Sequence, residues 1–489
     1  MENYINLTVK EMHEGLVNKK FTALDLVNHA IELVKQDKNN CYEALNFEQA
    51  IKEASLINEV KEDEYFKGIP FVVKDNYSTK DIETTASSDV LNGYVPTFDA
   101  EVVSRLKNAG AIIIAKTTLD ELAMGGTGTS GHKGVTTNPY DTSRIAGGSS
   151  CGSVASVCKG DVPFSLGSDT GDSVRKPASL CGIYGMKPTW GRISRFGLFP
   201  FAPSLDAVGY FARSTYDLAM LTNLLAGYDT KDMSSSTTKV EDYTSYLTND
   251  IKAKKIGYFK AVIDATTNKD IVNSFFKLVE KLKKEGYQVE EYDFPKELLD
   301  ALYPTYMVIS CCEATSNDAN LDGIKFGIKP DGSAKTWEEY MTSARTRGFS
   351  SLIKRRFIIG SFSLLAQNQD ELFRRAQKCR RLIVQEMEKF YKEFDYLLLP
   401  CAKDVASKIE DVTDKWSSKP NFVDNHLGLA NLGGYPSISL PLGYSSNLPF
   451  DVNITSRHFQ EGYMFNLAKH IEDITGLYNP TVNNHKEGL

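Results

Sequence analysis

Two loops rich in glycine and serine, both within residues 147–175, constrain this chain more than any other feature. The first loop reads Gly-Gly-Ser-Ser-Cys-Gly-Ser from Gly147, and the second reads Gly-Ser-Asp-Thr-Gly-Asp-Ser-Val-Arg from Gly167. Residues 170–173 can turn several backbone N–H groups toward one point beside Ser173, which would stabilise a developing oxyanion. A tight turn between a strand and a helix is the alternative, and the second loop alone favours it.

The residues around these loops predict an α/β fold. Residues 69–73 form a short continuous apolar run, typical of a buried strand that ends at Lys74. Residues 100–109 have helical periodicity, and residues 111–115 form a second apolar run. The order strand, helix, strand predicts that the two strands pair in parallel.

We interpret residues 1–489 as a single domain in three parts: a helical N-terminal layer (1–60), a core with the loops (65–240) and a C-terminal part (250–489). Residues 5–60 are expected to be helical, with Thr22 as a helix N-cap. Residues 183–210 are expected to be irregular, and 328–337 and 405–421 to be surface insertions. Further strands are expected at 255–258, 289–292, 396–400 and 437–441, and further helices at 149–159, 270–285, 301–317, 367–394, 427–432 and 463–472.

Composition excludes several classes of function. The net charge is −7 with both signs well mixed, so nothing indicates an electrostatic footprint for nucleic acid, and any RNA contact is expected through a partner. No apolar run approaches the roughly 20 residues of a membrane span, and the N-terminus does not read as a signal peptide. The eight cysteines show neither a Cys-x-x-Cys motif nor ligand spacing, which predicts no metal site and fits a reducing cytoplasm.

The most visible motif in the first loop is Gly-x-Ser-x-Gly, which would make Ser150 a nucleophile on a strand-to-helix elbow. That interpretation needs a strand directly before the loop, and residues 141–146 do not make one. It also needs a histidine, and His426, His458 and His470 lie in uninformative settings. A phosphate-binding loop is excluded because no Gly-Lys-Ser or Gly-Lys-Thr follows.

Lys74 is the third candidate. A lysine ammonium has a pKa of about 10.4 in water, so it can act as a base only if it is desolvated or close to other positive charges. The apolar residues 71–73 can supply that setting. Alone, such a lysine is more often a solvated strand end.

Together these pieces resemble the amidase signature family. The matching blocks, whose spacing also agrees with the family, are residues 68–76, 147–153, 167–175 and 182–189. The resemblance implies an α/β fold with a large mixed sheet covered by helices on both faces. It also implies a catalytic triad in which Lys74 is the base, Ser149 relays a proton across a cis peptide bond, and Ser173 is the nucleophile. The backbone of Thr170, Gly171 and Asp172 would form the oxyanion site, and Ser150 and Ser153 would bond the loops locally.

Further blocks resemble one branch of the family, the glutamine-hydrolysing A subunits of glutamyl-tRNA(Gln) amidotransferases. They are residues 123–126, 186–195, 313–317, 322–327, 354–356 and 431–434. By this resemblance Arg356 pairs with the α-carboxylate of glutamine and Asp424 with its α-ammonium. The ammonia released would convert Glu-tRNA(Gln) to Gln-tRNA(Gln) with B and C partner subunits, where ATP and Mg²⁺ act. This chain itself would hold no metal or cofactor.

Three positions in the loops depart from the family pattern: Asp172 and Cys151 replace glycines, and Lys176 replaces a glutamine. Residues 448–457 are also more polar than in relatives. A carboxylate at position 172 would oppose catalysis if it pointed toward the oxyanion, so we expect it to turn outward. Two alternatives therefore stay open: a stand-alone amidase for another small amide, and an assembly subunit whose site Asp172 has impaired.

Overall fold

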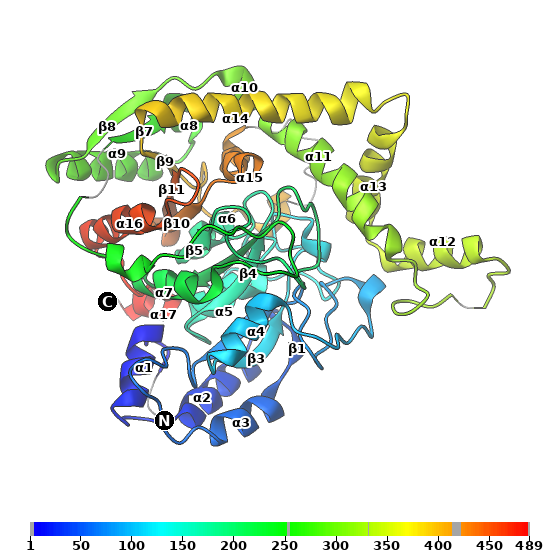
Figure 1. Ribbon diagram of the computed structural model, residues 1–489, viewed down its shortest axis with the longest axis horizontal. Helices are drawn as coiled ribbons and strands as arrows, with labels where there is room; N and C mark the ends of the chain where they lie inside the picture. The colour runs from blue at the N-terminus through cyan, green and yellow to red at the C-terminus, as the bar shows by residue number, and fades with distance from the viewer. Residues whose placement is uncertain (1–3, 252–254, 331, 413–421, 488–489) are drawn as a thin grey trace.

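One mixed β-sheet runs through the protein (Figure 1). The computed structural model describes residues 4–251, 255–330, 332–412 and 422–487. Within them, eleven strands pair in the order β1-β3-β2-β4-β6-β5-β10-β11-β9-β7-β8. Their bounds are β1 (Tyr42–Leu45), β2 (Pro70–Lys74), β3 (Ile112–Thr117), β4 (Ser165–Asp169), β5 (Tyr184–Lys187), β6 (Ala207–Ala212), β7 (Lys255–Phe259), β8 (Gln288–Tyr292), β9 (Tyr396–Pro400), β10 (Ser437–Ser445) and β11 (Leu448–Ser456).

The parallel pairing predicted for the first two apolar runs is confirmed. β2 lies between β3 and β4 and is parallel to both, and its five residues are all buried. β7 is likewise parallel to β8 and β9, whereas all other neighbours in the sheet are antiparallel. Because β2 and β4 run in the same direction, Lys74 and the second loop meet at the same edge of the sheet.

Helices pack around this sheet. In the N-terminal half they are α1 (Val9–Val17), α2 (Ala23–Lys35), α3 (Phe47–Ser55), α4 (Glu101–Asn108), α5 (Cys151–Lys159), α6 (Arg175–Cys181) and α7 (Thr215–Leu225). In the C-terminal half they are α8 (Lys260–Ala265), α9 (Lys269–Lys284), α10 (Lys296–Asp300), α11 (Leu302–Asn317), α12 (Trp337–Gly348), α13 (Ser351–Leu364), α14 (Arg375–Glu393), α15 (Leu429–Gly433), α16 (Glu461–Thr475) and α17 (Val482–Glu487).

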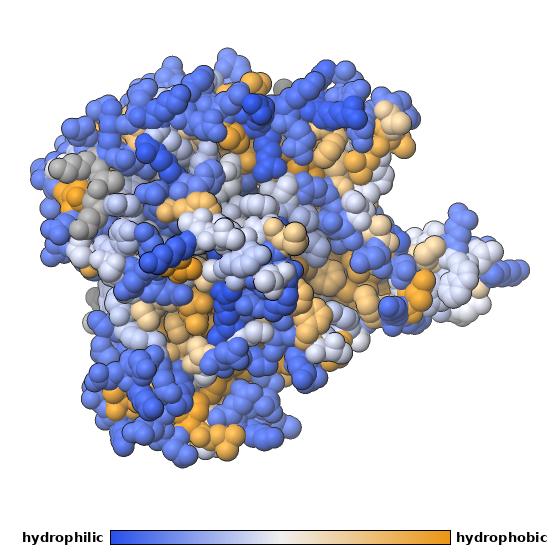
Figure 2. Space-filling view, viewed as in Figure 1, coloured by the Kyte–Doolittle hydropathy of each residue, from blue (hydrophilic) through white to orange (hydrophobic). Residues whose placement is uncertain are grey.

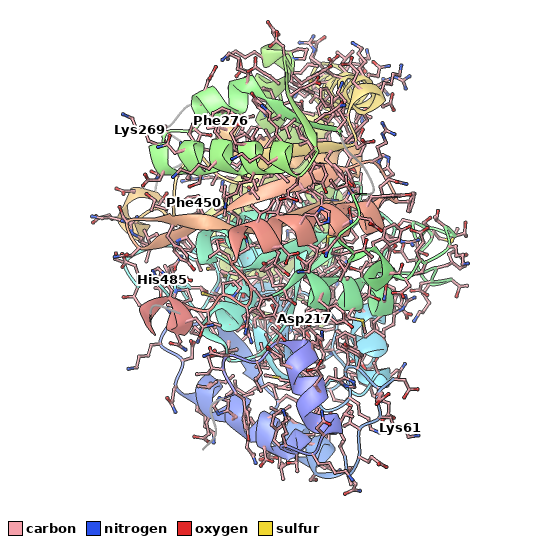
Figure 3. All side chains as sticks on the ribbon, turned by 90° about the vertical axis from the view of Figure 1, so that its left-hand side faces the viewer. Lys61, Asp217, Lys269, Phe276, Phe450 and His485 are labelled. Atoms are coloured by element: carbon pink, nitrogen blue, oxygen red, sulfur yellow. The ribbon has the colours of Figure 1, made fainter. Side chains whose placement is uncertain are left out.

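Side chains cap the first turns of the N-terminal helices. Thr22 is the N-cap of α2, as predicted, and exchanges hydrogen bonds with Asp25 in a capping box. The buried carboxylate of Asp217 on α7 accepts hydrogen bonds from the backbone N–H groups of Val9 and Lys10 at 3.0 and 3.2 Å, as the position of Asp217 above α1 in Figure 3 illustrates. The negative charge therefore lies at the positive end of the α1 dipole.

Helices α11, α12 and α13 form an arm that projects to the right in Figure 1. Figure 2 shows apolar side chains on its surface, near the turn between α13 and α14. Ile358, Phe362 and Leu365 are among the exposed large hydrophobic residues, with exposed fractions of 68, 57 and 46 %. Helix α13 thus leaves an apolar face in contact with solvent, and we call these three residues the α13 face.

The structure corrects two sequence predictions. Residues 5–60 are not all helical, because they include the short edge strand β1, whose four residues are all at least partly exposed. Residues 183–210 are not irregular throughout, because they contain β5 and most of β6. The glycines in these strands hide the strand pattern: a Cβ on Gly209 would lie 2.7 Å from a methyl group of Val174, so only glycine lets the α6 segment pack this closely.

Residues 448–456, which the sequence showed only as unusually polar, form β11, and this strand pairs with β9 and β10. The other predicted strands and helices are present within a few residues of their expected bounds. Residues 331 and 413–421, in the two predicted surface insertions, lie outside the described residues.

Candidate active site

Lys74 ends β2 inside the protein, with no exposed surface. Its Nζ atom donates hydrogen bonds to three hydroxyl groups, those of Ser149 at 2.8 Å, Ser150 at 2.9 Å and Ser168 at 2.9 Å. An ammonium group has three protons, so three hydroxyl oxygens can satisfy it, but none of them carries a charge. The residue is therefore a buried lysine whose hydrogen bonds are all to neutral groups.

Burial lowers the pKa of Lys74 to about 7, although the negative charges of Asp120, Asp169 and Asp206, together with the Cys151 thiol, act in the opposite direction. The cause is desolvation, which disfavours the charged form of an amine. Near neutral pH a substantial fraction of Lys74 is therefore uncharged and has a lone pair that can accept a proton.

Ser149 and Ser150 lie between the turn at Gly147 and the start of α5. The peptide bond between Gly148 and Ser149 is cis, as the resemblance implied. The Ser150 N–H donates to the carbonyl oxygen of Ser173 at 3.3 Å, which joins the first loop directly to the second. The two loops and Lys74 are thus brought together, although 75 residues separate Lys74 from Ser149 along the chain.

A buried ion pair fixes the second loop. Arg175 donates from Nε and Nη2 to the two carboxylate oxygens of Asp169, at 3.1 and 2.9 Å, and both side chains are completely buried. Burial alone would raise the pKa of Asp169, but the charge and hydrogen bonds of Arg175 outweigh it and lower this pKa to about 2. Arg175 also donates to the carbonyl oxygen of Gly171 at 2.8 Å. The loop that carries Ser173 is therefore held at both ends.

Thr170, Gly171 and Asp172 lie between β4 and Ser173, where the oxyanion site is predicted. The Thr170 hydroxyl donates to Asp206 Oδ1 at 2.6 Å, and Ser173 is 4 % exposed. The Asp172 carboxylate is 17 % exposed and lies 3.6 Å from Lys176 Nζ. The charge at position 172 thus faces a lysine at the start of α6.

Arg356, on α13, is 9 % exposed, and its Nε is buried without a hydrogen-bond partner. Its guanidinium lies 5.5 Å from the ring centre of Phe201. Burial is the main reason that the pKa of Tyr306 is raised, while the charge of Arg356 lowers this pKa and that of Asp172 raises it. The charges of Arg356 and of the Ser173 loop therefore act on the same tyrosine.

Asp424 lies on the other side of Lys176. Its carbonyl oxygen accepts a hydrogen bond from Lys176 Nζ at 2.9 Å, and its Oδ2 lies 2.8 Å from Lys403 Nζ. The carboxylate is 39 % exposed. Asp424 is thus adjacent to the Ser173 loop through Lys176, and its charge is balanced by Lys403, a neighbour that the sequence did not suggest.

Sequence reasoning missed two contacts of Lys74. Ser150, expected only to bond the loops locally, also accepts a hydrogen bond from Lys74 Nζ. Ser168 does so as well, and its hydroxyl also accepts from Asn76 Nδ2 at 3.0 Å. Both serines lie inside the matching blocks, so the pattern contained them but gave no sign of which hydroxyls face the lysine.

The elbow interpretation of Ser150 is not supported. No strand precedes α5 within the fully described stretch 141–150, and Ser150 lies at the N-cap of the helix. The ring of buried His426 lies between the backbone carbonyl oxygens of Val423 and Pro400, at 2.9 and 2.8 Å, and so has no nitrogen left for a serine. Among the described residues there is also no group of three His, Cys, Asp or Glu that could hold a metal ion.

Comparisons with known proteins match nearly the whole chain. The model of the family described as Amidase matches residues 23–464. The chain belongs to the amidase family. Curated relatives that bear the name of the A subunit of glutamyl-tRNA(Gln) amidotransferase include one from Fusobacterium nucleatum, 38 % identical over 98 % of each chain, and one from Pediococcus pentosaceus, 36 % identical over 97 % of this chain and 98 % of the relative.

Comparison with solved structures agrees with this family assignment. The crystal structure of the A subunit of glutamyl-tRNA(Gln) amidotransferase from Thermotoga maritima is 32 % identical, covers 99 % of both chains and superposes with a TM-score of 0.81. A peptide amidase in complex with chymostatin is 24 % identical, with a TM-score of 0.83, and shows the same fold. The α/β amidase fold predicted from the sequence is therefore confirmed. Among the described helices, none combines the length and the apolar character that a membrane span requires.

Proposed function

We propose that this chain is the glutaminase subunit of a glutamyl-tRNA(Gln) amidotransferase, with Lys74, Ser149 and Ser173 as its catalytic triad. One observation carries the proposal: a buried lysine with a pKa of about 7 lies 2.8 Å from the hydroxyl of Ser149, on a loop bonded to Ser173. The relatives that cover nearly the whole chain bear the name of this subunit.

In the proposed reaction, neutral Lys74 takes the proton of Ser149, which takes the proton of Ser173 as Ser173 Oγ forms a bond to the side-chain amide carbon of glutamine. The negative charge that develops on the amide oxygen is stabilised by the backbone N–H groups of residues 170–172. The proton then returns through Ser149 to the leaving nitrogen, the carbon–nitrogen bond breaks and ammonia departs. Water hydrolyses the remaining ester and restores Ser173.

Glutamine is recognised as a zwitterion in this proposal. The buried Nε of Arg356 has no hydrogen-bond partner, and a substrate carboxylate would provide one with matching charge and a two-pronged geometry. Asp424 would receive the α-ammonium group. Because Asp424 already pairs with Lys403, the ammonium has to share or replace that contact.

The released ammonia would serve B and C partner subunits that convert misacylated Glu-tRNA(Gln), with ATP and Mg²⁺ bound at the partner. Names of the relatives support such a complex, and the α13 face offers an apolar surface for a protein contact. We place the complex in the cytoplasm, where tRNA is aminoacylated and the eight free cysteines stay reduced.

Trapping with a glutamine analogue that carries an electrophilic carbon at the amide position tests the proposal. We expect one equivalent to bind covalently to Ser173, seen by peptide mass spectrometry, and no label on the Ser173→Ala variant. Ammonia release from glutamine is then measured with and without the partner subunits. Full turnover of an unrelated amide without partners, and none of glutamine, would instead identify a stand-alone amidase.

A further inference from the structure

Asp120 lies just after β3 and is completely buried. Its Oδ2 accepts hydrogen bonds from the backbone N–H groups of Thr127 and Gly128, at 3.1 and 2.9 Å. Its Oδ1 accepts from the N–H groups of Thr129 and Ser130, at 3.0 and 3.2 Å, and from the Ser130 hydroxyl at 2.8 Å. The Asp120 carboxylate thus accepts five hydrogen bonds, and these hold residues 127–130 in place.

The same residue contacts the catalytic loop from the other side. The backbone N–H of Asp120 donates to the carbonyl oxygen of Ser149 at 3.1 Å. A Cβ atom on Gly148 would lie only 2.0 Å from Asp120 Oδ2, and one on Gly125 would lie 2.3 Å from its Cγ. The carboxylate therefore fills the space between residues 125 and 148, and a side chain at either position would displace it.

We propose that Asp120 is a positioning residue for the proton relay, because it fixes the backbone of Gly148 and Ser149 so that the Ser149 hydroxyl stays in contact with Lys74. The inference rests on the proposed function of the triad. Proton transfer depends steeply on such contacts, since a displacement of about 1 Å can cost roughly 100-fold in rate. Asp120 does not touch the reacting atoms and acts only through Ser149 and through its charge.

The negative charge of Asp120 acts on the pKa of Lys74, which a residue with a purely structural role would not do. The titratable groups with the largest effects on Lys74 are Cys151, Asp120, Asp169 and Asp206, and each of them raises the pKa of Lys74 against the effect of burial. Asp169 is paired with Arg175, whereas Asp120 is held by backbone N–H groups and one hydroxyl. Removing the charge at position 120 should therefore lower the pKa of Lys74 further.

The test measures how fast an aryl sulfonyl fluoride labels Ser173, by intact-protein mass, from pH 5.5 to 9. This reaction needs the relay but does not depend on the identity of the natural amide. We expect Asp120→Asn to label about 10- to 100-fold more slowly at high pH, with the midpoint of its acid limb at lower pH than in the wild type. The exposed Asp404→Asn is the matched control and should change neither quantity.

Each outcome decides something different. An Asp120→Asn variant that labels at the wild-type rate with the wild-type midpoint overturns the inference, and so does one that is slower with an unchanged midpoint, because the charge of Asp120 would then have no effect on Lys74. Should this variant not fold, Ser130→Ala withdraws one donor from the carboxylate and has to slow labelling by about two- to tenfold; an unchanged rate overturns the inference. If wild type is not labelled at Ser173 at all, the proposed triad fails instead.

Discussion

Lys176 Nζ lies 3.6 Å from the Oδ2 atom of Asp172, the residue directly before Ser173. The same lysine donates to the carbonyl oxygen of Asp424. From the sequence, Asp172 was the residue that most threatened activity, because a carboxylate beside the oxyanion loop would oppose the developing negative charge. Its pairing with Lys176, itself a departure from the family pattern, balances that charge locally. The positive charge of Lys176 thus offsets the negative charge of Asp172, four residues earlier in the chain.

Replacing Asp172 therefore tests whether the site is active. A partly exposed ion pair contributes about 0–1 kcal/mol, so we expect Asp172→Gly and Asp172→Asn to change kcat for glutamine hydrolysis by less than about fivefold. Steady-state ammonia release is the measurement, and Ser173→Ala is the inactive reference. An inert wild type with an active Asp172→Gly variant would show that this chain serves only in assembly.

The rate of glutamine hydrolysis should rise with pH through about 7. Lys74 has to be neutral to act as a base, and burial lowers its pKa to about 7, so the active form predominates above this pH and is lost below it. A profile of kcat from pH 5.5 to 9 checks this. Lys74→Met should reduce the rate by about 100- to 10,000-fold and remove the acid limb. A midpoint near pH 4 would instead indicate a carboxylate base.

Substrate recognition by Arg356 should appear mainly in KM. Loss of a charge-assisted hydrogen bond to a carboxylate costs about 1.5–3 kcal/mol, so Arg356→Met should raise KM for glutamine by about 10- to 100-fold. Lys403→Met removes the cation that pairs with Asp424, and we expect it to lower KM because the substrate ammonium no longer competes. Equal KM values for glutamine and for its analogue without the α-carboxylate would contradict the role of Arg356.

The ion pair between Asp169 and Arg175 should dominate the stability of the second loop. Removing one partner of a buried pair costs about 3–5 kcal/mol in the free energy of unfolding, so Arg175→Met should be strongly destabilised in urea melts at pH 7. As a control, Lys296→Met breaks an exposed pair with Asp300 and should cost no more than about 1 kcal/mol.

The stability difference between the wild type and Arg175→Met should also depend on pH. The pKa of Asp169 is lowered to about 2 in the folded protein, below its ordinary value of about 3.9. Its contribution to stability is therefore complete above about pH 4 and is lost as the pH falls toward 2. The difference between wild type and Arg175→Met should narrow as the pH is lowered from 5 to 3. A constant difference would mean that Arg175 stabilises the loop by packing alone.

The sequence by itself determined the family, the parallel core strands and the candidate triad. These follow from local signals: apolar runs such as 69–73, which can only be buried, and loop patterns whose glycines and serines lie close together in the chain. Strands β5 and β6 were missed, since a strand whose glycines make room for a neighbouring helix has no apolar alternation to detect. The edge strand β1 was missed for a different reason: its four residues are all at least partly exposed and form no apolar run.

Only the tertiary structure decided which hydroxyls surround Lys74 and where the charges of the site are balanced. Ser150 and Ser168 contact the lysine, Asp424 pairs with Lys403, and Asp120 gathers a loop around itself, yet none of these partners follows from its neighbours in sequence. Desolvation, ion pairing and carboxylate–amide contacts depend on distances between segments far apart in the chain. The two serine loops could be identified from the sequence, but their orientation toward Lys74 is set by the order and direction of β2 and β4 in the sheet.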